Sequence, residues 1–495
     1  MLKKAIITSA KIVTFLLITF LILSGITEIF KYKSTETVSR TYYCYPGNTF
    51  DVIFLGSSVM KNDVYPMQLY SEQGISSYNL GCGSQSLASS YWLAKQAIRQ
   101  HKPKLIVLDC VFSYLDTAYL SDEHLHYVTD VLSYPEKFEL VNEIVPEDQR
   151  SNYLFELAVY HNRFSSLNKA DFFTENNCDY GAKVHSWEGA FDANYDVITE
   201  SSKIPSISEE YLIKIIELCK ENNIELLLTV MPMDYYQQGT SMDMVECQKN
   251  YNYISEIADK YNLKYLNFMY HTTETSLDPQ RDYDGGRHLN YFGATKLTKY
   301  LGEYIKSNYE LPDVRTNSKY DFMKTDNDIF NEYCYKQVIK QTRLIEHYLQ
   351  ALKGLADTEK YTMVFSVRDI QGYSLTQEQA DLLKALGFDN ADTLLEHEYH
   401  SFVGVIDGKT VVAQNIGNGD NGDGNTKYHG MLNDMNISVT SQTLHGGNTS
   451  SISVSGKEYS KNMRGFNIVV VDNTTGKVID SVAFDTHVPE FTCTR

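Results

Sequence analysis

Three groups of residues in this chain have the types and the order that covalent acyl chemistry needs. A pair of serines, Ser57 and Ser58, follows the apolar run "DVIFL" after a single glycine. Gly81 follows a second strand-like run, "SYNL", and Asp284 and His288 stand late in the chain in "RDYDGGRHLNYFGA". A hydroxyl, backbone N–H groups exposed by glycine, and an acid with a histidine are the parts of a serine nucleophile, its oxyanion site and its base.

These residues predict a specific division of labour. Ser58 Oγ would attack an acyl carbonyl, His288 Nε2 would accept its proton, and Asp284 would hold the other ring nitrogen in the required tautomer. The backbone N–H groups of Ser58 and Gly81 would stabilise the oxyanion. Two simpler interpretations stay open: Ser58 only caps a helix after a tight turn, and His288 is a polar residue capping the last helix of the domain.

Alternating strand and helix patterns up to about residue 310 predict the framework that positions these residues. Amphipathic helical patterns begin at Leu87, Ser208 and Met244. They separate strand-like runs, which read "DVIFL", "SYNL", "KLIVLD", "IELLLTVMP" and "KYLNF". Such an order specifies an α/β fold with three layers, in which helices cover both faces of a parallel sheet. Ligands of open α/β sheets bind at the carboxyl edge of the strands.

The arrangement resembles the SGNH/GDSL hydrolase superfamily over roughly residues 50 to 310. The resemblance rests on "LGSSV", "YNLGCGSQS" and "DGGRHLNYFGA", of which the last is the most specific. It implies Ser58 as nucleophile, Gly81 in the oxyanion site and His288 as base, with neither a cofactor nor a metal. The spacing to the acid departs from the family's Asp-x-x-His by one residue. The acid is therefore Asp284 in a bulged loop, or Asp282, or it is dispensable.

A second departure concerns the end of the third strand. The family places an asparagine there as an oxyanion donor, whereas this chain has "LDCVFSY", with Asp109 at the tip. A carboxylate stabilises developing negative charge poorly unless it is protonated or turned away. Two functions therefore stay open, an active acyl enzyme and a protein that kept the fold without the activity.

The stretch "AVYHNRFSSLNKADFF" lies in a long insertion between the third strand and the helix at Ser208. Its "YHNRF" pattern resembles a segment of membrane-anchored SGNH-like proteins of Gram-positive bacteria. Those proteins stand near the teichoic-acid D-alanylation accessory family and the partners of membrane-bound O-acyltransferases. The resemblance implies that His161 and Arg163 contact an anionic or polyhydroxy substrate. An ordinary helix turn with a surface histidine and arginine is the alternative.

The N-terminus has the pattern of an uncleaved membrane anchor. Lys3, Lys4 and Lys11 precede an apolar run from Ile12 to about Phe30, which is long enough to cross a bilayer as one helix. The basic flank places the N-terminus in the cytoplasm and everything after residue 35 outside the cell. We therefore expect a plasma-membrane protein with a single span.

Charge and cysteine usage exclude other classes. The formal net charge of −19 argues against a nucleic-acid partner. The eight cysteines form no Cys-x-x-Cys pair, which argues against a zinc site. Cys44 and Cys493 stand where a disulfide bridge is a candidate.

The C-terminal part changes character after a tyrosine-rich helical connector over residues 311–355. Residues 356–495 read as an α+β domain with two hairpins, one turning at Asp407-Gly408 and one at "NTTG". The stretches "SVRDIQGYSLTQEQADLLKALG" and "RGFNIVVVDNTTGKVIDSVAFDTH" resemble the interleukin-like EMT inducer domain, which implies a carbohydrate-binding module. Arg368, Asp369 and Arg464 are its candidate sugar ligands. The loop "GNGDNGDGNTKYHG" is either a flexible loop or a weak calcium site.

Together these patterns predict four segments: an anchor (1–35), a hydrolase-like domain (36–310), the connector (311–355) and the C-terminal domain (356–495). The predicted function is a membrane-anchored extracellular serine acylesterase or O-acyltransferase acting on cell-surface polysaccharide or teichoic acid. A membrane-bound O-acyltransferase is a candidate partner. The alternative function is an inactive, SGNH-like glycan-binding or assembly protein of the cell envelope.

Overall fold

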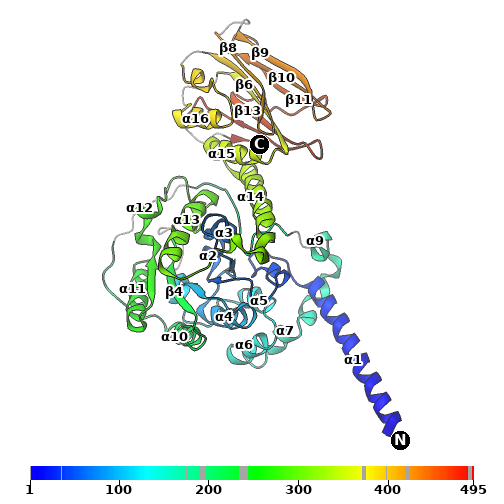
Figure 1. The fold of residues 1–495 in the computed structure, drawn as a ribbon, viewed down its shortest axis with the longest axis vertical. Helices are drawn as coiled ribbons and strands as arrows, with labels where there is room; N and C mark the ends of the chain where they lie inside the picture. Colours follow the sequence, from blue (N-terminus) through cyan, green and yellow to red (C-terminus); the bar gives the residue numbers. More distant parts are fainter. Residues whose placement is uncertain are drawn as a thin grey trace.

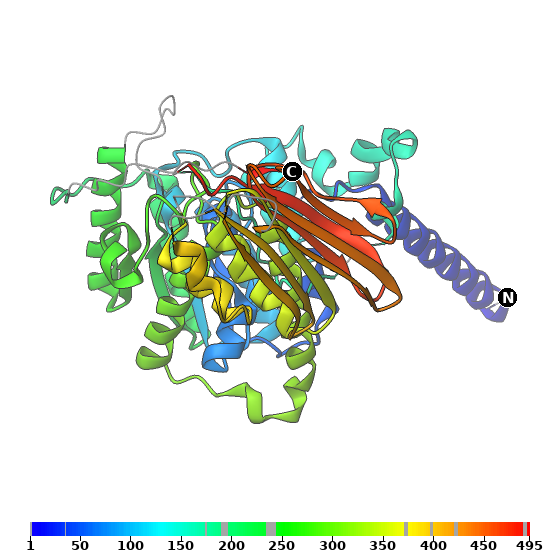
Figure 2. The same cartoon turned by 90° about the horizontal axis from the view of Figure 1, so that it is seen from above.

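The computed structural model describes residues 2–34, 36–173, 176–189, 197–233, 244–370, 375–396, 399–419, 424–488 and 493–495. An apolar N-terminal helix, an α/β domain and a β-rich C-terminal domain follow one another along the chain (Figure 1). The predicted fold class is confirmed. Seen from above, the strands of the C-terminal domain cross over one side of the α/β domain, and the N-terminal helix projects away from both (Figure 2).

The α/β domain is built on a parallel sheet of five strands in the order β2-β1-β3-β4-β5. The strands are β1 (Val52–Leu55), β2 (Ser77–Asn79), β3 (Leu105–Asp109), β4 (Glu225–Val230) and β5 (Lys264–Asn267). All five correspond to the predicted strand runs. Every residue of β1 and β3 is buried, as expected for strands covered on both faces. Strand β2 lies on one side of β1, and β3, β4 and β5 lie on the other side. The direction of the strand order therefore reverses beside β1, which is the switch point of the sheet.

Helices cover both faces of this sheet (Figure 1). On one side α4 packs against α10, and on the other α2, α3 and α13 pack together, while α11 lies against β5. The bounds are α2 (Ser58–Asp63), α3 (Pro66–Gln73), α4 (Leu87–His101), α10 (Ser206–Glu221), α11 (Met244–Tyr261), α12 (Thr272–Thr275) and α13 (Tyr291–Asn308).

The insertion between β3 and α10 forms short helices around the end of the N-terminal helix. Helix α1 (Leu2–Phe30) contacts the insertion near its C-terminal end. The insertion comprises α5 (Asp122–Thr129), α6 (Glu136–Ile144), α7 (Arg150–Leu154), α8 (Glu156–Tyr160), the 3-10 turn η3 (His161–Ser165) and α9 (Lys169–Phe172). Within Ile6–Phe30 of α1 a stretch of 18 residues reaches a mean hydropathy of 2.4, so this helix is long and apolar enough to cross a membrane.

Two helices form the predicted connector, and their side chains belong to the cores of both domains. Helix α14 (Asp321–Gln341) inserts Phe330 and Cys334 into the core of the α/β domain. Val338 and Ile339, at the other end of α14, belong to the core of the C-terminal domain, as does most of α15 (Ile345–Asp357). A single helix thus carries side chains of both cores.

The C-terminal domain is a two-layer β structure with helices on one face. Strands β6 and β10 pair only at Gln442 with Arg368 and Thr443 with Asp369, after which they diverge and pack side chains between them. Helices α15 and α16 cover the other face. The bounds are β6 (Tyr361–Asp369), α16 (Gln377–Ala385), β7 (His400–Asp407), β8 (Thr410–Asn418), β9 (Thr426–Leu432), β10 (Met435–Thr443), β11 (Ser450–Val454), β12 (Lys457–Glu458), β13 (Gly465–Asp472), β14 (Lys477–Phe484) and β15 (Cys493–Thr494).

The two predicted hairpins are present in this domain, as β7 with β8 and β13 with β14. Strands β9 to β11 were not expected. Part of the predicted acidic loop belongs to β8 and β9, and its residues 420–423 lie outside the described residues. The candidate bridge between Cys44 and Cys493 is not formed, because both thiols are free.

Candidate functional site

The turn after β1 separates the two serines of the opening motif. Ser57 is 1% exposed, and its hydroxyl accepts a hydrogen bond from the backbone N–H of Val59 at 3.3 Å, which makes it the N-cap of α2. Ser58 is the first residue of α2 and is partly exposed. Both interpretations of the motif therefore apply, but to different residues: Ser57 caps the helix and Ser58 presents its hydroxyl.

The structure brings Ser58, His288 and Asp284 together in one hydrogen-bonded relay. His288 Nε2 lies 2.9 Å from Ser58 Oγ, although 230 positions separate the two residues in the chain. His288 Nδ1 lies 3.2 Å from Asp284 Oδ2. This is the geometry of a nucleophile, a base and the group that orients the base.

A closed loop accommodates the extra residue between the acid and the histidine. The backbone N–H of Asp284 donates to the His288 carbonyl at 3.1 Å, and Gly285 takes a φ of +74°, which glycine adopts without strain. Asp284 Oδ1 accepts from the backbone N–H groups of Gly286 at 2.7 Å and His288 at 3.3 Å. The structure thus has the bulged loop, in which Asp284 faces His288 Nδ1.

Electrostatics keep Asp284 ionised. Burial raises the pKa of Asp284, but the hydrogen bond and charge of His288, the nearby His185 and the Gly286 N–H outweigh it, so the pKa lies below its usual value. The rival acid, Asp282, is bonded instead to Lys296 Nζ at 2.7 Å and to the Asp278 N–H at 2.6 Å.

A second histidine, His185, faces the same carboxylate and was not predicted. Its Nε2 lies 3.9 Å from Asp284 Oδ2, and its ring stands nearly perpendicular to that of His288. Burial lowers the pKa of His185 to about 4, so the ring is neutral at pH 7. A lone histidine in "GAKVHSW" has no spacing that could have indicated this position.

His185, Asp284 and His288 also have the residue types that hold a metal ion. Each offers one ligand atom, and these atoms lie within 4.8 Å of one another. A divalent ion there would compete with the hydrogen bond that orients His288. The same three groups can therefore hold a metal or orient a base, and the short contact with Ser58 favours the second.

The predicted oxyanion donors are in different situations. Ser58 is the first residue of α2, so its N–H has no acceptor within the helix. The Gly81 N–H instead donates to Asn79 Oδ1 at 3.0 Å. The Asn79 amide in turn donates to the carbonyls of Met60 and Val64, which fixes the turn after β2 against α2.

Asp109, at the end of β3, lies buried under the nucleophile turn. A Cβ added at Gly56 would approach its Cβ to 2.6 Å. Asp109 Oδ1 accepts from the backbone N–H groups of Val111 and Met231, each at 3.2 Å. Burial raises the pKa of Asp109 to about 7, against the hydrogen bonds that lower it. The carboxyl group thus stabilises the backbone turns that follow β3 and β4.

Asp63 is a further buried acid that sequence reasoning did not identify. It ends α2, and its Oδ1 accepts from the Leu289 N–H at 3.1 Å. Burial raises the pKa of Asp63 well above its usual value. Because Leu289 follows His288, this hydrogen bond joins the helix that begins at Ser58 to the loop that holds the base.

The structure does not place His161 and Arg163 with this relay. Arg163 donates to the carbonyls of Phe30 and Lys31 at 2.6 and 2.7 Å, and His161 Nδ1 lies 2.7 Å from the Ala158 carbonyl. Both residues belong to η3, beside the end of α1. Their described contacts stabilise that junction.

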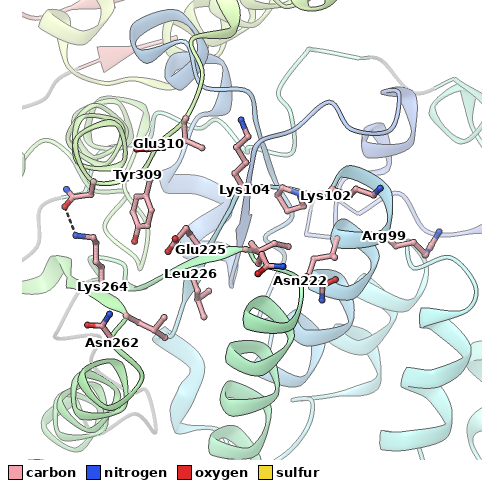
Figure 3. Close-up of a pocket in the computed structure, with 17 residues that line it drawn as sticks. Arg99, Lys102, Lys104, Asn222, Glu225, Leu226, Asn262, Lys264, Tyr309 and Glu310 are labelled. Atoms are coloured by element: carbon pink, nitrogen blue, oxygen red, sulfur yellow. Dashed lines mark hydrogen bonds between the residues drawn. The ribbon is translucent and has the colours of Figure 1, made fainter.

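A cavity of about 1030 Å³ lies at the other edge of the sheet. Lys104, Glu225 and Lys264 line it at the amino ends of β3, β4 and β5 (Figure 3). Ser58 follows the carboxyl end of β1, so this cavity is remote from the relay despite its size.

The candidate sugar ligands of the C-terminal domain have partners within it. Arg464 forms a bidentate ion pair with Asp485, at 3.0 and 2.7 Å. Arg368 donates to the Asn448 and Asn462 carbonyls. Asp369 ends β6 with a φ of +72°.

Comparisons with known proteins agree with both resemblances. The interleukin-like EMT inducer family model matches residues 464–492. A GDSL-like lipase from Bacteroides thetaiotaomicron is similar in structure, with 11% identity, a TM-score of 0.28, and coverage of 52% of this chain and 88% of that chain. The acetyl xylan esterase AlAXEase has 13% identity, a TM-score of 0.27, and coverage of 51% and 98%. No protein with a curated description matches the sequence. Because both TM-scores are low, the chemistry of the site rests on its own geometry.

Proposed function

We propose that this chain is a serine acylesterase or O-acyltransferase that acts on a polysaccharide outside the cell. The observation that carries the proposal is the relay from Ser58 through His288 to Asp284, with contacts of 2.9 and 3.2 Å. Ser58 lies at the carboxyl edge of the sheet, next to the switch point, where ligands of such folds bind.

In the first half-reaction Ser58 Oγ bonds to the acyl carbonyl carbon while its proton moves to His288 Nε2. The tetrahedral intermediate then expels the alcohol of the donor ester, which takes the proton back from His288. The acyl group is left on Ser58. Asp284 stabilises the imidazolium through Nδ1, a role that suits its lowered pKa.

In the second half-reaction His288 removes a proton from water or from a sugar hydroxyl, and the resulting oxygen attacks the acyl-serine. The bond from the acyl carbon to Ser58 Oγ then breaks, and Ser58 Oγ takes the proton back from His288. Water gives hydrolysis and a sugar hydroxyl gives transfer, from the same intermediate. The Ser58 N–H is the proposed oxyanion donor. The Gly81 N–H is the second proposed donor. It would release its present acceptor, Asn79 Oδ1, and donate to the oxyanion instead.

The proposed setting is the outer face of the plasma membrane. Helix α1 serves as an uncleaved anchor, and Lys3, Lys4 and Lys11 keep its N-terminus in the cytoplasm. The C-terminal domain would then retain the enzyme on polysaccharide or teichoic acid, and a membrane-bound O-acyltransferase would supply the acyl group. Protease added to intact cells should degrade the C-terminal domain, and protection until the cytoplasm is opened would contradict this orientation.

The decisive experiment treats the full chain with a fluorophosphonate probe and locates the label by mass spectrometry. We expect the label on Ser58. The Ser57→Ala variant is the matched control, because it removes the neighbouring hydroxyl and one cap hydrogen bond but leaves the relay in place. Labelling that survives Ser58→Ala and disappears in Ser57→Ala would show that Ser57, and not Ser58, is the nucleophile.

One observation favours a second function, a glycan-binding protein without activity. The Gly81 N–H is occupied by Asn79, and the end of β3 offers the buried Asp109 where an amide donor is expected. On this alternative the folded chain binds polysaccharide, but it neither takes the probe nor hydrolyses an activated ester.

A further inference from the structure

An exposed aromatic surface lies on the insertion, far in sequence from the catalytic relay. We call it the aromatic surface and define it by residues 155–173, which form α8, η3 and α9. Phe155, Phe164 and Phe173 are 68%, 72% and 67% exposed, and Phe172 is also exposed. Several large aromatic side chains gathered on one short segment are unusual on a surface that faces only water.

This surface is fixed to the C-terminal end of α1 (Figure 1). The Arg163 guanidinium donates to the carbonyl of Phe30, the last residue of α1, and to that of Lys31, which follows it. It also lies 4.5 Å from the centre of the Tyr32 ring. Arg163 also forms an ion pair with Asp171 at 2.8 Å. The same arginine therefore joins η3 and α9 to the point where the apolar helix ends.

The length of α1 sets the height of this point above a membrane. The apolar run that follows Lys11, Ile12–Phe30, has 19 residues, or about 28 Å at about 1.5 Å per residue. The hydrocarbon core of a bilayer is about 30 Å thick. The end of α1 therefore lies at the outer boundary of the hydrocarbon core, and the aromatic surface lies beside that end.

A groove continues from α1 onto the insertion and indicates what covers it. It has a volume of about 770 Å³, and its apolar lining comes from α1, at Phe20 and Leu23, and from the insertion, at Tyr134, Leu154 and Phe155. Because Phe20 and Leu23 belong to the segment that would cross the bilayer, lipid chains surround this groove whenever α1 is inserted. The apolar surface is thus continuous from α1 to Phe155.

Charged groups close the polar end of the groove. Lys31 and Lys137 both pair with the buried carboxylate of Glu156, the first residue of α8. Together with Glu28, which lies 2.6 Å from Lys31 Nζ, Glu156 balances these two charges at the level where the apolar lining ends. The exposed Tyr32 and Tyr134 beside this boundary match the aromatic belts of membrane proteins, and exposed phenylalanines match the apolar face of helices that lie in the interface.

We propose that the aromatic surface is a bilayer-docking surface, which inserts Phe155, Phe164, Phe172 and Phe173 into the outer headgroup region beside α1. The occupant is the lipid bilayer itself. The α/β domain is then held at a fixed height and orientation on the membrane and does not swing on a flexible tether.

The test uses the full-length chain in lipid nanodiscs that contain dibrominated phosphatidylcholine, which quenches tryptophan at membrane depth. Tryptophan is introduced singly in Phe164→Trp and Phe173→Trp. The matched control is Met431→Trp, on β9 of the C-terminal domain, because Met431 is as exposed as these residues, at 65%. Ile18→Trp, within α1, reports insertion of the anchor. Each signal is the increment over the parent protein, in which Trp92 and Trp187 give the background.

We expect brominated lipid to quench the added fluorescence strongly in Phe164→Trp, Phe173→Trp and Ile18→Trp, and to leave Met431→Trp unchanged. The proposal would be overturned if Phe164→Trp and Phe173→Trp stayed as unquenched as Met431→Trp while Ile18→Trp was quenched. The aromatic surface would then be a candidate contact for a protein partner. An unquenched Ile18→Trp would overturn the proposal as well, because α1 would then not be inserted. None of these readouts depends on acyl chemistry, although the docking surface rests on one part of the proposed function, the insertion of α1 as a membrane anchor, which Ile18→Trp reports separately.

Discussion

Replacing Asp284 by asparagine should abolish nearly all turnover without disturbing the loop. Asp284 Oδ1 accepts two backbone N–H groups, from Gly286 and His288, so the amide oxygen of an asparagine must take this position. The amide NH2 group then occupies the position of Oδ2, 3.2 Å from His288 Nδ1. Because an NH2 group only donates, Nδ1 must accept, and the ring proton moves to Nε2. His288 would then point a proton at Ser58 and could not act as its base.

The size of the effect follows from this tautomer change. An asparagine at the acid position of a serine relay lowers kcat by about 10⁴-fold, which corresponds to about 5.5 kcal/mol of transition-state stabilisation. The KM of a small ester should change little, because the acid does not contact the substrate. The midpoint of thermal unfolding should also change little, since both backbone hydrogen bonds are kept.

The assay is hydrolysis of p-nitrophenyl acetate by the full chain in detergent, with the fluorophosphonate labelling rate measured in parallel. Asp282→Asn is the matched control, because Asp282 is bonded to Lys296 and to the Asp278 N–H and not to the histidine. Its kcat should stay within about threefold of the parent value, about 0.7 kcal/mol in the barrier. An Asp284→Asn enzyme that keeps a tenth or more of the parent kcat, or an equal loss in Asp282→Asn, would refute the assignment of the acid.

Two further predictions concern the turn that carries Ser58. Gly56→Ala should lower both the thermal midpoint and kcat, because the added Cβ would lie 2.6 Å from the Asp109 Cβ. The expected loss in the free energy of unfolding is about 3 kcal/mol. An unchanged midpoint would show that the turn relaxes freely. Asp109 has a pKa of about 7 in the fold and about 3.8 when unfolded, so the fold loses stability as pH rises from about 4 to 7, by up to about 4 kcal/mol. Asp109→Asn should therefore raise the thermal midpoint at pH 8 more than at pH 5, and an equal change at both values would contradict this.

The strands of the α/β sheet were predictable because their burial is written directly in the sequence. A parallel strand covered on both faces needs a continuous apolar run, and "VIFL" and "LIVL" are such runs, short and rich in β-branched residues. Strands β9 to β11 were missed for the opposite reason. In β10, Met435–Thr443, buried and more exposed positions alternate, and the exposed ones carry Asn, Ser, Thr and Gln, which also favour loops.

In the site, residue types and their order along the chain were enough to indicate Ser58 and His288, but geometry was needed for the rest. Only the three-dimensional turn distinguishes the capping Ser57 from the exposed Ser58. Asp284 was the preferred acid, but the sequence left Asp282 open, because the choice depends on a backbone loop closed by its own hydrogen bonds. His185 comes from a segment without strand or helix periodicity, so no pattern connected it with the relay.

That segment also ties the two domains together. The His185 carbonyl accepts from the Tyr291 N–H at 2.8 Å, which fixes the segment to the start of α13. One residue later the Ser186 N–H donates to Gln341 Oε1, also at 2.8 Å, at the end of α14. Glu188 then lies 3.0 Å from His347 Nδ1 on α15.

Asp284 and helix α15 of the C-terminal domain are therefore both in contact with one short stretch of chain, residues 185–188. His347 stacks on Phe292 of α13 with ring centres 3.7 Å apart, so α15 also contacts the helix that follows the base loop. A displacement of α15 must shift Glu188, and Glu188 is only three residues from His185 beside Asp284. Sequence patterns alone suggest a separable binding module. These contacts instead place α15 and the Asp284 carboxylate against the same segment, residues 185–188, so the position of the C-terminal domain and the arrangement of the relay depend on shared contacts.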